Sequence, residues 1–378
     1  MLQAIDINGF RKYEKFSIDG FGNINFILGS NNVGKTSILE AIFAWACGQN
    51  IYSFMNIPLA RARYANIKNP YWVMEELLAT VNKRHNLPLV MSFNGKYNDK
   101  FEEFKHTIFP SDLLTEYDSS YKKYFEKKTP RSNDVSIVDV SQLMGAIPNI
   151  VQMPPVLIAK WEVNYNGKTF STDVTVPQIQ MVGIKPFKQA KYIDILSHID
   201  VSENVQMYAS LKREKLLNDV VEDIGKVFPE IDGFDMIPYP DGSQAPVSVI
   251  KKDGNVLPLY ACGDGIQKWF YIFGALAVYK NSIICIDEID SGFHPKAQAS
   301  FCKNMVKNAL KNGVQLFVTT HNIEFVDNFI DSISELEKIN YEGIRIITVR
   351  DAENEFQMRN ISVEEAKNGR EEYNLELR

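Results

Sequence analysis

The stretch "GSNNVGKTS", residues 29–37, has the residue types and spacing of a phosphate-binding loop. It fits the pattern G-x-x-x-x-G-K-[ST], whose glycines let the backbone turn and approach phosphate oxygens. Lys35 is expected to reach the β- and γ-phosphates, and the Thr36 hydroxyl to ligate Mg²⁺. An apolar stretch precedes the loop and a helical stretch follows it, so we predict binding of a nucleoside triphosphate, with ATP expected. The residues predicted to contact it are Asn31, Asn32, Val33, Gly34, Lys35, Thr36 and Ser37.

An acidic pair ends the apolar run of "SIICIDEIDSG". Asp287 follows four apolar residues, so we expect it at the carboxyl end of a buried parallel strand, where ligands bind in open α/β sheets. Asp287 is then placed to hold Mg²⁺, and Glu288 to orient and deprotonate the attacking water. The alternative is a strand end whose acidic residues face solvent, which is less consistent with a complete phosphate loop elsewhere in the chain.

A histidine ends the next apolar strand, "VQLFVTTH". At that position the imidazole of His321 would lie near the γ-phosphate and the attacking water, where it can sense or polarise them. The alternative is a histidine that is bonded to a neighbouring loop. Its order in the chain, one helix and one strand after the acidic pair, favours the functional interpretation.

A second glycine-rich turn, "CGDGIQK", precedes the most apolar stretch of the chain. Gly263, Asp264 and Gly265 would leave the N-terminus of the following helix open as an anion site. One nucleotide has a single γ-phosphate, which the first loop already holds. We therefore expect this turn to contact a nucleotide bound to another subunit. The alternative is a glycine-rich turn that only caps a core helix.

The elements that position these residues read as an α/β fold. Alternating apolar residues predict strands near the N-terminus, with a hairpin-like turn at "DGFGN". A second hairpin is predicted around Asn166-Gly167, and a helix over residues 203–228. From residue 247 onward, apolar strands alternate with helices. The pattern predicts a mixed, mostly parallel sheet with flanking helices, and an N-terminal antiparallel β subdomain.

The composition of the 378 residues is that of an ordinary globular protein, with 45% hydrophobic and 23% charged residues. The net charge of −6 does not fit a protein that binds nucleic acid over its whole surface. Four scattered cysteines without metal-type spacing indicate a reduced, cytoplasmic protein. The longest apolar run, residues 269–279, is shorter than the roughly 20 residues that cross a bilayer, so no membrane partner is expected.

Taken in order, these four motifs resemble the core of an ABC-type ATPase. More narrowly, "INFILGSNNVGKTSILEAIF", "IDEIDSGFHP" and "FVTTHN" look like the OLD and RecF/SMC-related group. The resemblance implies a P-loop NTPase fold of the ABC type and assigns the same roles to the loop, acidic pair and histidine. It also implies that Asp290, Ser291 and Gly292 form a loop that couples two sites. "CGDGIQK" departs from the "SGGQ" pattern of transporter subunits, which argues against a transporter.

The resemblance divides the chain into a discontinuous core, residues 1–48 and 156–378, and a mainly helical insertion of unknown role, residues 49–155. The glutamine of the family's lid loop has three candidates: Gln178, Gln180 and Gln189. Only 57 residues follow His321, too few for the Toprim nuclease domain that many OLD-type proteins carry, and no long coiled-coil arms are predicted.

These features predict an ATPase that works at a head-to-tail interface of a homodimer or higher homo-oligomer. Stand-alone ATPases of this size resemble sensor or scaffold subunits of prokaryotic anti-phage systems, so we expect a separate nuclease or toxin as effector. One alternative is a RecF-like DNA-repair ATPase, for which the lysines and aromatic residues of 121–128 could form a DNA-binding patch; a solvated helix face is the other interpretation of that stretch. A second alternative is an assembly module that binds ATP but barely hydrolyses it.

Overall fold

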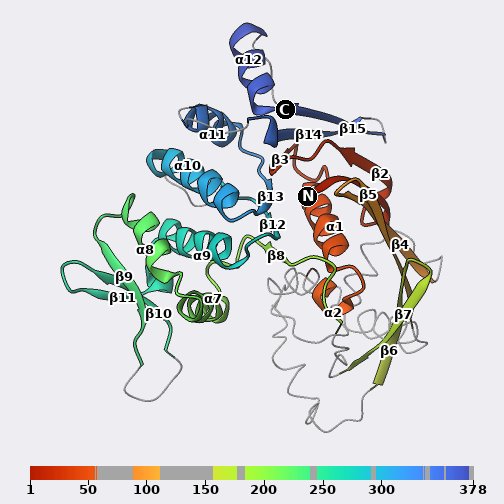
Figure 1. The fold of residues 1–378 in the computed structure, drawn as a ribbon, viewed down its shortest axis with the longest axis horizontal. Coiled ribbons are helices and arrows are strands. Elements are labelled where there is room, and N and C mark those ends of the chain that lie inside the picture. Colours follow the sequence, from red (N-terminus) through yellow and green to blue (C-terminus); the bar gives the residue numbers. More distant parts are fainter. Residues whose placement is uncertain are drawn as a thin grey trace, which may run out of the picture.

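A computed structural model describes residues 1–55, 57, 88–110, 156–176, 184–238, 245–290, 295–334, 336, 341–352 and 355–373. Within these residues the strands form two six-stranded sheets and one three-stranded sheet (Figure 1). The predicted α/β fold with a mostly parallel sheet and an N-terminal antiparallel sheet is confirmed.

The mixed sheet contains the strands whose carboxyl ends border the site. Its order is β15 (Glu355–Ser362), β14 (Ile344–Ala352), β3 (Ile24–Leu28), β13 (Gln315–Thr319), β12 (Ile283–Ile286) and β8 (Ala190–Ile193), and only β15 runs antiparallel to its neighbour. Both faces are covered, because Ile283 and Cys285 lie in one core cluster and Ile284 and Ile286 in the other. The parallel arrangement brings the carboxyl ends of β3, β12 and β13 to one edge.

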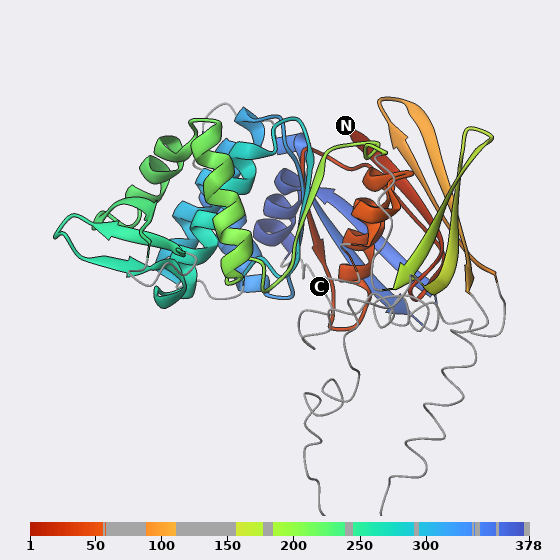
Figure 2. The ribbon, with the colours of Figure 1, turned by 90° about the horizontal axis from the view of Figure 1, so that it is seen from below.

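Helix α1 (Lys35–Cys47) lies between the mixed sheet and the antiparallel sheet (Figure 2). All of its residues except Thr36 are buried. A helix that is buried on all sides is expected where two layers cover it. The phosphate loop therefore leads directly into the centre of the molecule, and its helix cannot shift without disturbing both sheets.

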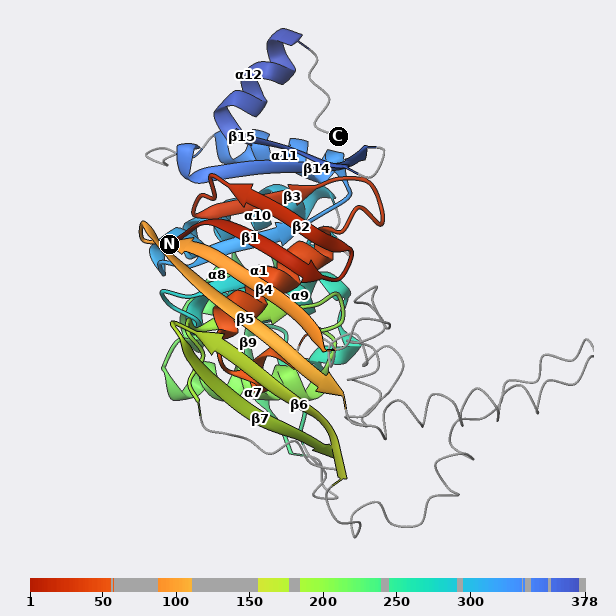
Figure 3. The same ribbon diagram turned by 90° about the vertical axis from the view of Figure 1, so that its right-hand side faces the viewer.

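The antiparallel sheet covers the other side of α1 (Figure 3). Its order is β2 (Tyr13–Asp19), β1 (Leu2–Phe10), β4 (Leu89–Tyr97), β5 (Lys100–Pro110), β6 (Val156–Tyr165) and β7 (Lys168–Val176). Residues 89–110 were predicted within the mainly helical insertion, and for them that prediction is wrong. They form strands because alternate side chains, such as Phe93 and Phe104, are buried in the core around α1. The rest of 49–155 lies outside the described residues, apart from α2 (Ile51–Phe54) and its immediate neighbours.

The turns decide how the strands are distributed. Asn166 and Gly167, with φ values of 50° and 74°, form the tight turn of the β6–β7 hairpin, as predicted. The stretch "DGFGN" does not form a hairpin, because it leads from β2 into β3 of the other sheet. The N-terminal hairpin instead joins β1 to β2 at Arg11 and Lys12.

Helices cover the second face of the mixed sheet and share a core with it. They are α7 (Val201–Arg213), α8 (Leu217–Gly225), α9 (Asp264–Val278), α10 (Pro295–Lys311) and α11 (Ile323–Ser334). The single helix predicted over 203–228 is two helices, since Lys215 adopts a left-handed φ of 59° and ends the first. Strands β9 (Ile231–Met236), β10 (Val247–Lys251) and β11 (Val256–Pro258) form the small sheet, and α12 (Val363–Tyr373) follows β15. Among the helices described, none is long and apolar enough to span a bilayer.

Candidate nucleotide-binding site

The phosphate loop connects β3 to α1 and borders a cavity of about 480 Å³. Gly29 and Gly34 have φ values of 150° and 105°, and a Cβ on Gly34 would lie 2.3 Å from the Tyr13 hydroxyl. Both positions therefore require glycine. Lys35 Nζ donates to the carbonyls of Gly29 and Ser30 at 2.9 Å each. Burial lowers the pKa of Lys35, while Glu288, Asp287 and Asp290 oppose that shift.

The residues that line this cavity include most of those predicted from the sequence. They are Arg11, Lys12, Asn31, Asn32, Gly34, Lys35, Thr36, Ser37, Asp287, Glu288 and His321. Val33 is buried and does not line it. The structure thus brings together the phosphate loop, the acidic pair and the histidine, which lie far apart in the chain.

Asp287 follows β12 and faces the start of α1. The Thr36 hydroxyl lies 3.1 and 3.0 Å from its two carboxylate oxygens. Burial raises the pKa of Asp287, and the hydroxyls of Thr319 and Thr36 counteract this by donating to it. A hydroxyl and a carboxylate that converge in this way are the hard oxygen donors that Mg²⁺ prefers.

Glu288 is held in a strained backbone conformation, with a left-handed φ of 46°. Its N–H donates to Thr319 Oγ1 at 2.9 Å, and Thr319 Oγ1 donates to Asp287. The N–H of Ile289 donates to the Thr319 carbonyl at 3.1 Å. Thr319, at the end of β13, therefore fixes both acidic residues. Non-glycine residues in such conformations cluster at active sites, where the surroundings must stabilise them.

The hairpin turn between β1 and β2 supports the loop from the other side. Lys12 Nζ donates to the Asn32 carbonyl at 2.8 Å, and the Tyr13 hydroxyl donates to the Val33 carbonyl at 3.2 Å. Arg11 forms a buried ion pair with Glu40 of α1 at 3.0 Å. The start of the chain therefore contributes two cationic side chains to the cavity.

His321 follows the end of β13 and is exposed. It lines the nucleotide cavity and also a neighbouring cavity of about 580 Å³, which Asn31 shares. Its position beside the phosphate loop agrees with the sequence prediction, while its role in hydrolysis stays a prediction.

Some predicted residues lie elsewhere. Gly263, Asp264 and Gly265 form the start of α9 and do not line the nucleotide cavity. Among the described residues, no atom outside their chain neighbours and the backbone of the first turn of α9 lies within 4 Å of a Cβ built on either glycine, so the turn is open. Ser291 and two lid candidates, Gln178 and Gln180, lie outside the described residues.

The third lid candidate lies at the wrong edge. Gln189 precedes β8, and its carbonyl accepts from the N–H of Ile283 at the start of β12. The carboxyl ends of these strands are roughly 13 Å away, since each residue of a strand adds about 3.3 Å. Gln189 therefore cannot cover a nucleotide at the phosphate loop.

Several site residues were not found from the sequence. Thr319 and Thr320 are polar residues directly after the apolar residues of β13, and that was the available signal. Thr320 donates to Asp290. The contributions of Arg11 and Lys12 had no signal, because only the pairing of β1 with β2 places them at the loop.

The fold and this constellation define a P-loop ATPase of the ABC type. Two family models match separate parts of the chain. Residues 1–142 match the "AAA ATPase domain", and residues 191–327 match "AAA domain, putative AbiEii toxin, Type IV TA system". Two stretches of the chain thus match models of AAA-family ATPase domains, and the chain is an ATPase.

Relatives and solved structures agree with this class. The chain is 24% identical to an ATP/GTP phosphatase of Helicobacter pylori, over 86% of this chain and 87% of the relative. It is 26% identical to the DNA replication and repair protein RecF of Actinobacillus pleuropneumoniae, over 30% of this chain and 32% of that protein. Among solved structures, an SMC head bound to the C-terminal winged-helix domain of ScpA has a TM-score of 0.51 at 12% identity, over 97% of this chain and 99% of that chain.

Proposed function

We propose that two copies of the chain form a composite ATPase, in which the glycine turn of one copy closes on the nucleotide of the other. The observation that carries this proposal is the separation of the motifs. Lys35, Asp287, Glu288 and His321 border one cavity, whereas the open turn at Gly263 does not line it. An open helix N-terminus attracts anions, so a phosphate supplied by a second copy would satisfy it.

In this proposal each residue has a defined task. Thr36 and Asp287 would hold Mg²⁺, which, when bound, neutralises charge on the β- and γ-phosphates. Lys35 exchanges its loop carbonyls for phosphate oxygens. Glu288 accepts the proton of the attacking water, and His321 donates to the γ-phosphate or the water. The Thr319 hydroxyl holds the Glu288 backbone and the Asp287 carboxylate in position.

The test is a Glu288→Gln variant. We expect hydrolysis to collapse while ATP binding and ATP-dependent association persist, because the amide keeps the shape of the side chain but cannot act as a base. Measuring the molecular mass with and without ATP shows whether copies associate, and phosphate release measures turnover. Unchanged turnover would exclude Glu288 as the base, and a monomer under both conditions would exclude the composite site. Association with negligible wild-type turnover would indicate the assembly module.

For the biological role, we propose an ATPase that senses or scaffolds in an anti-phage system and controls a separate nuclease or toxin. Two findings support it: the family description for residues 191–327 names a toxin–antitoxin system, and the SMC head of similar fold was solved with a partner domain bound. Copurification from the native host tests it. A nuclease or toxin that elutes with the ATPase in an ATP-dependent manner is the expected result.

A RecF-like role in DNA repair is the second candidate, and the partial match to RecF favours it. The basic stretch 121–128 that it would use lies outside the described residues. It predicts ATP-dependent DNA binding whose affinity falls steeply with salt. Binding of a duplex at physiological salt by the Glu288→Gln variant would favour repair over defence.

A further inference from the structure

A buried lysine lies just past the glycine turn, on the first part of α9. Lys268 is on α9, one helical turn after Asp264, so the two side chains share a face. It is 4% exposed, and the carboxylates of Asp264, Asp290 and Glu288 act on its ammonium group. Glu288 and Asp290 also act on Lys35. These two carboxylates therefore lie within electrostatic reach of both the phosphate-loop lysine and the lysine behind the glycine turn.

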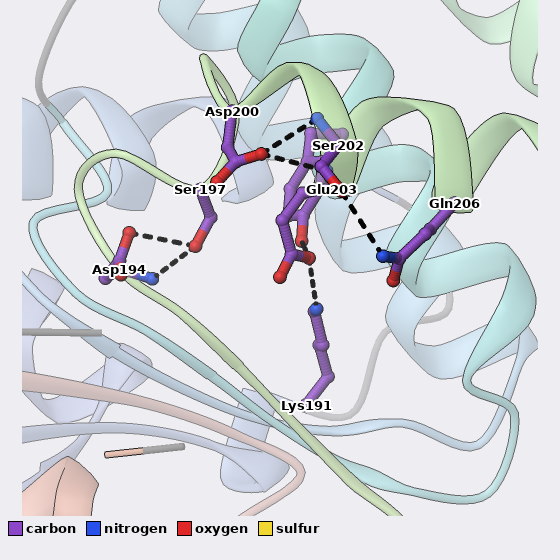
Figure 4. A network of polar contacts seen from close by, with 8 residues as sticks. Lys191, Asp194, Ser197, Asp200, Ser202, Glu203 and Gln206 are labelled. Atoms are coloured by element: carbon purple, nitrogen blue, oxygen red, sulfur yellow. Dashed lines mark hydrogen bonds and ion pairs between the residues drawn. The ribbon is translucent and has the colours of Figure 1, made fainter. Parts of the chain in front are cut away.

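Asp264, in the glycine turn, is held by a residue of the segment that follows β8. His198 Nε2 contacts Asp264 Oδ1, and His198 is buried while Asp264 is partly exposed. His198 belongs to the short turn that follows β8, where Ser197 Oγ donates to Asp194 at 2.9 Å (Figure 4). The carbonyl of Ile193, just before this turn, accepts from the N–H of Asp287.

A second set of contacts joins β8 to α9, by way of α7. Lys191 of β8 pairs with Glu203 of α7 at 2.8 Å (Figure 4). The Tyr271 hydroxyl of α9 also donates to Glu203. The end of β8, the start of α9 and the end of β12 are thus held in one framework. A displacement of the glycine turn cannot leave the acidic pair unaffected.

We infer that Lys268 is a positioning residue that couples the glycine turn of α9 to Glu288 of the same copy. The inference rests on the composite site proposed above. When the turn closes on a nucleotide of the second copy, Asp264 turns toward that copy and competes less for the ammonium group. Lys268 then acts more strongly on Glu288 and Asp290. Glu288 adopts a strained backbone conformation that its surroundings must stabilise, so a change in its electrostatic partners would displace it.

The test compares Lys268→Met with wild type and with Lys280→Met. Methionine keeps length and volume without charge, and Lys280 is an exposed lysine just past the other end of α9. We expect Lys268→Met to bind ATP and to associate like wild type, but to hydrolyse on the order of 10- to 100-fold more slowly, because Glu288 is misplaced. Lys280→Met should hydrolyse normally. A double variant of Lys268→Met and Asp264→Asn should hydrolyse ATP only slightly more slowly than Lys268→Met alone, since both residues affect hydrolysis through the same interaction.

A second measurement separates positioning from packing. Burial lowers the pKa of Lys268 to about 8, against the opposing carboxylates of Asp264, Asp290 and Glu288. Wild-type turnover should therefore fall above about pH 8 as the charge is lost, and Lys268→Arg should lack this fall. The coupling through Lys268 would be overturned if turnover fell equally above pH 8 in wild type and Lys268→Arg. It would also be overturned if Lys268→Met associated and hydrolysed ATP like wild type. Neither result would affect the composite site. A wild type that never associates with ATP would instead overturn the composite site.

Discussion

The hydroxyl of Thr36 lies 3.0 and 3.1 Å from the two carboxylate oxygens of Asp287, although 251 residues separate them in the chain. The contact joins the first turn of α1 to the end of β12. Oxygen donors at this separation can share a single cation.

Thr36→Val should remove the effect of Mg²⁺ on nucleotide binding. The methyl group preserves shape but cannot donate to Asp287 or ligate a metal. We expect wild type to bind ATP more tightly with Mg²⁺ than with a chelator, and the variant to bind equally in both. Thr36→Ser, which keeps the hydroxyl, is the matched control. A valine variant that still responds to Mg²⁺ would remove Thr36 from the metal site.

Thr319→Val should slow hydrolysis while leaving ATP binding nearly intact. Thr319 Oγ1 accepts from the Glu288 N–H and donates to Asp287, so valine removes both supports. Loss of such supporting contacts typically costs roughly 10- to 100-fold in activity. Single-turnover phosphate release measures the effect, with Thr319→Ser as control. If Thr319→Val matched wild type, the strained Glu288 would not need this hydroxyl.

The sequence predicts local features of this site well and long-range ones poorly. The phosphate loop and the acidic pair follow from local patterns, because loop chemistry and strand ends depend on neighbouring residues. The contact of Thr319 with the acidic pair depends on the register of β12 and β13, which pairs Ile286 with Val318. No local pattern specifies that register.

The same limit applies to the fold. Residues 89–110 contain alternating apolar residues, but their strands exist because they extend the sheet that begins with β1. The hairpin at Asn166-Gly167 was predictable because two adjacent residues are enough to specify its turn. The "DGFGN" turn was misread because its glycines suit a sheet change as well as a hairpin. Pairing between distant segments decides these cases.

Arg11 and Glu40 should show the behaviour of a buried ion pair. Their side chains are 4% and 1% exposed, and Arg11 Nε lies 3.0 Å from Glu40 Oε2. Arg11→Met leaves Glu40 without this cation and should lower the free energy of unfolding by about 3–5 kcal/mol. The double variant with Glu40→Leu should recover most of that loss. Chemical denaturation measures both. A double variant no more stable than Arg11→Met would mean that Glu40 has adequate partners without Arg11.

His106 should make the antiparallel sheet sensitive to acid. It lies on β5, fully buried among Phe54, Phe93 and Trp161, and its Nδ1 accepts from Trp161 Nε1 at 3.2 Å. Burial lowers its pKa from 6.5 to about 3. The folded state therefore keeps the ring neutral, while the unfolded chain takes up a proton below pH 6.5.

The sign follows from this difference in bound protons. The stability that depends on the neutral ring is complete above pH 6.5 and is lost as the pH falls toward 3, at about 1.4 kcal/mol per pH unit for one proton. His106→Asn keeps an acceptor for Trp161 but does not titrate. We expect it to be less stable than wild type at pH 8, since ring contacts are lost, and the gap to narrow as the pH falls from 6.5 to 4. Denaturant unfolding at each pH measures the gap, and a constant gap would show that His106 does not contribute to acid sensitivity.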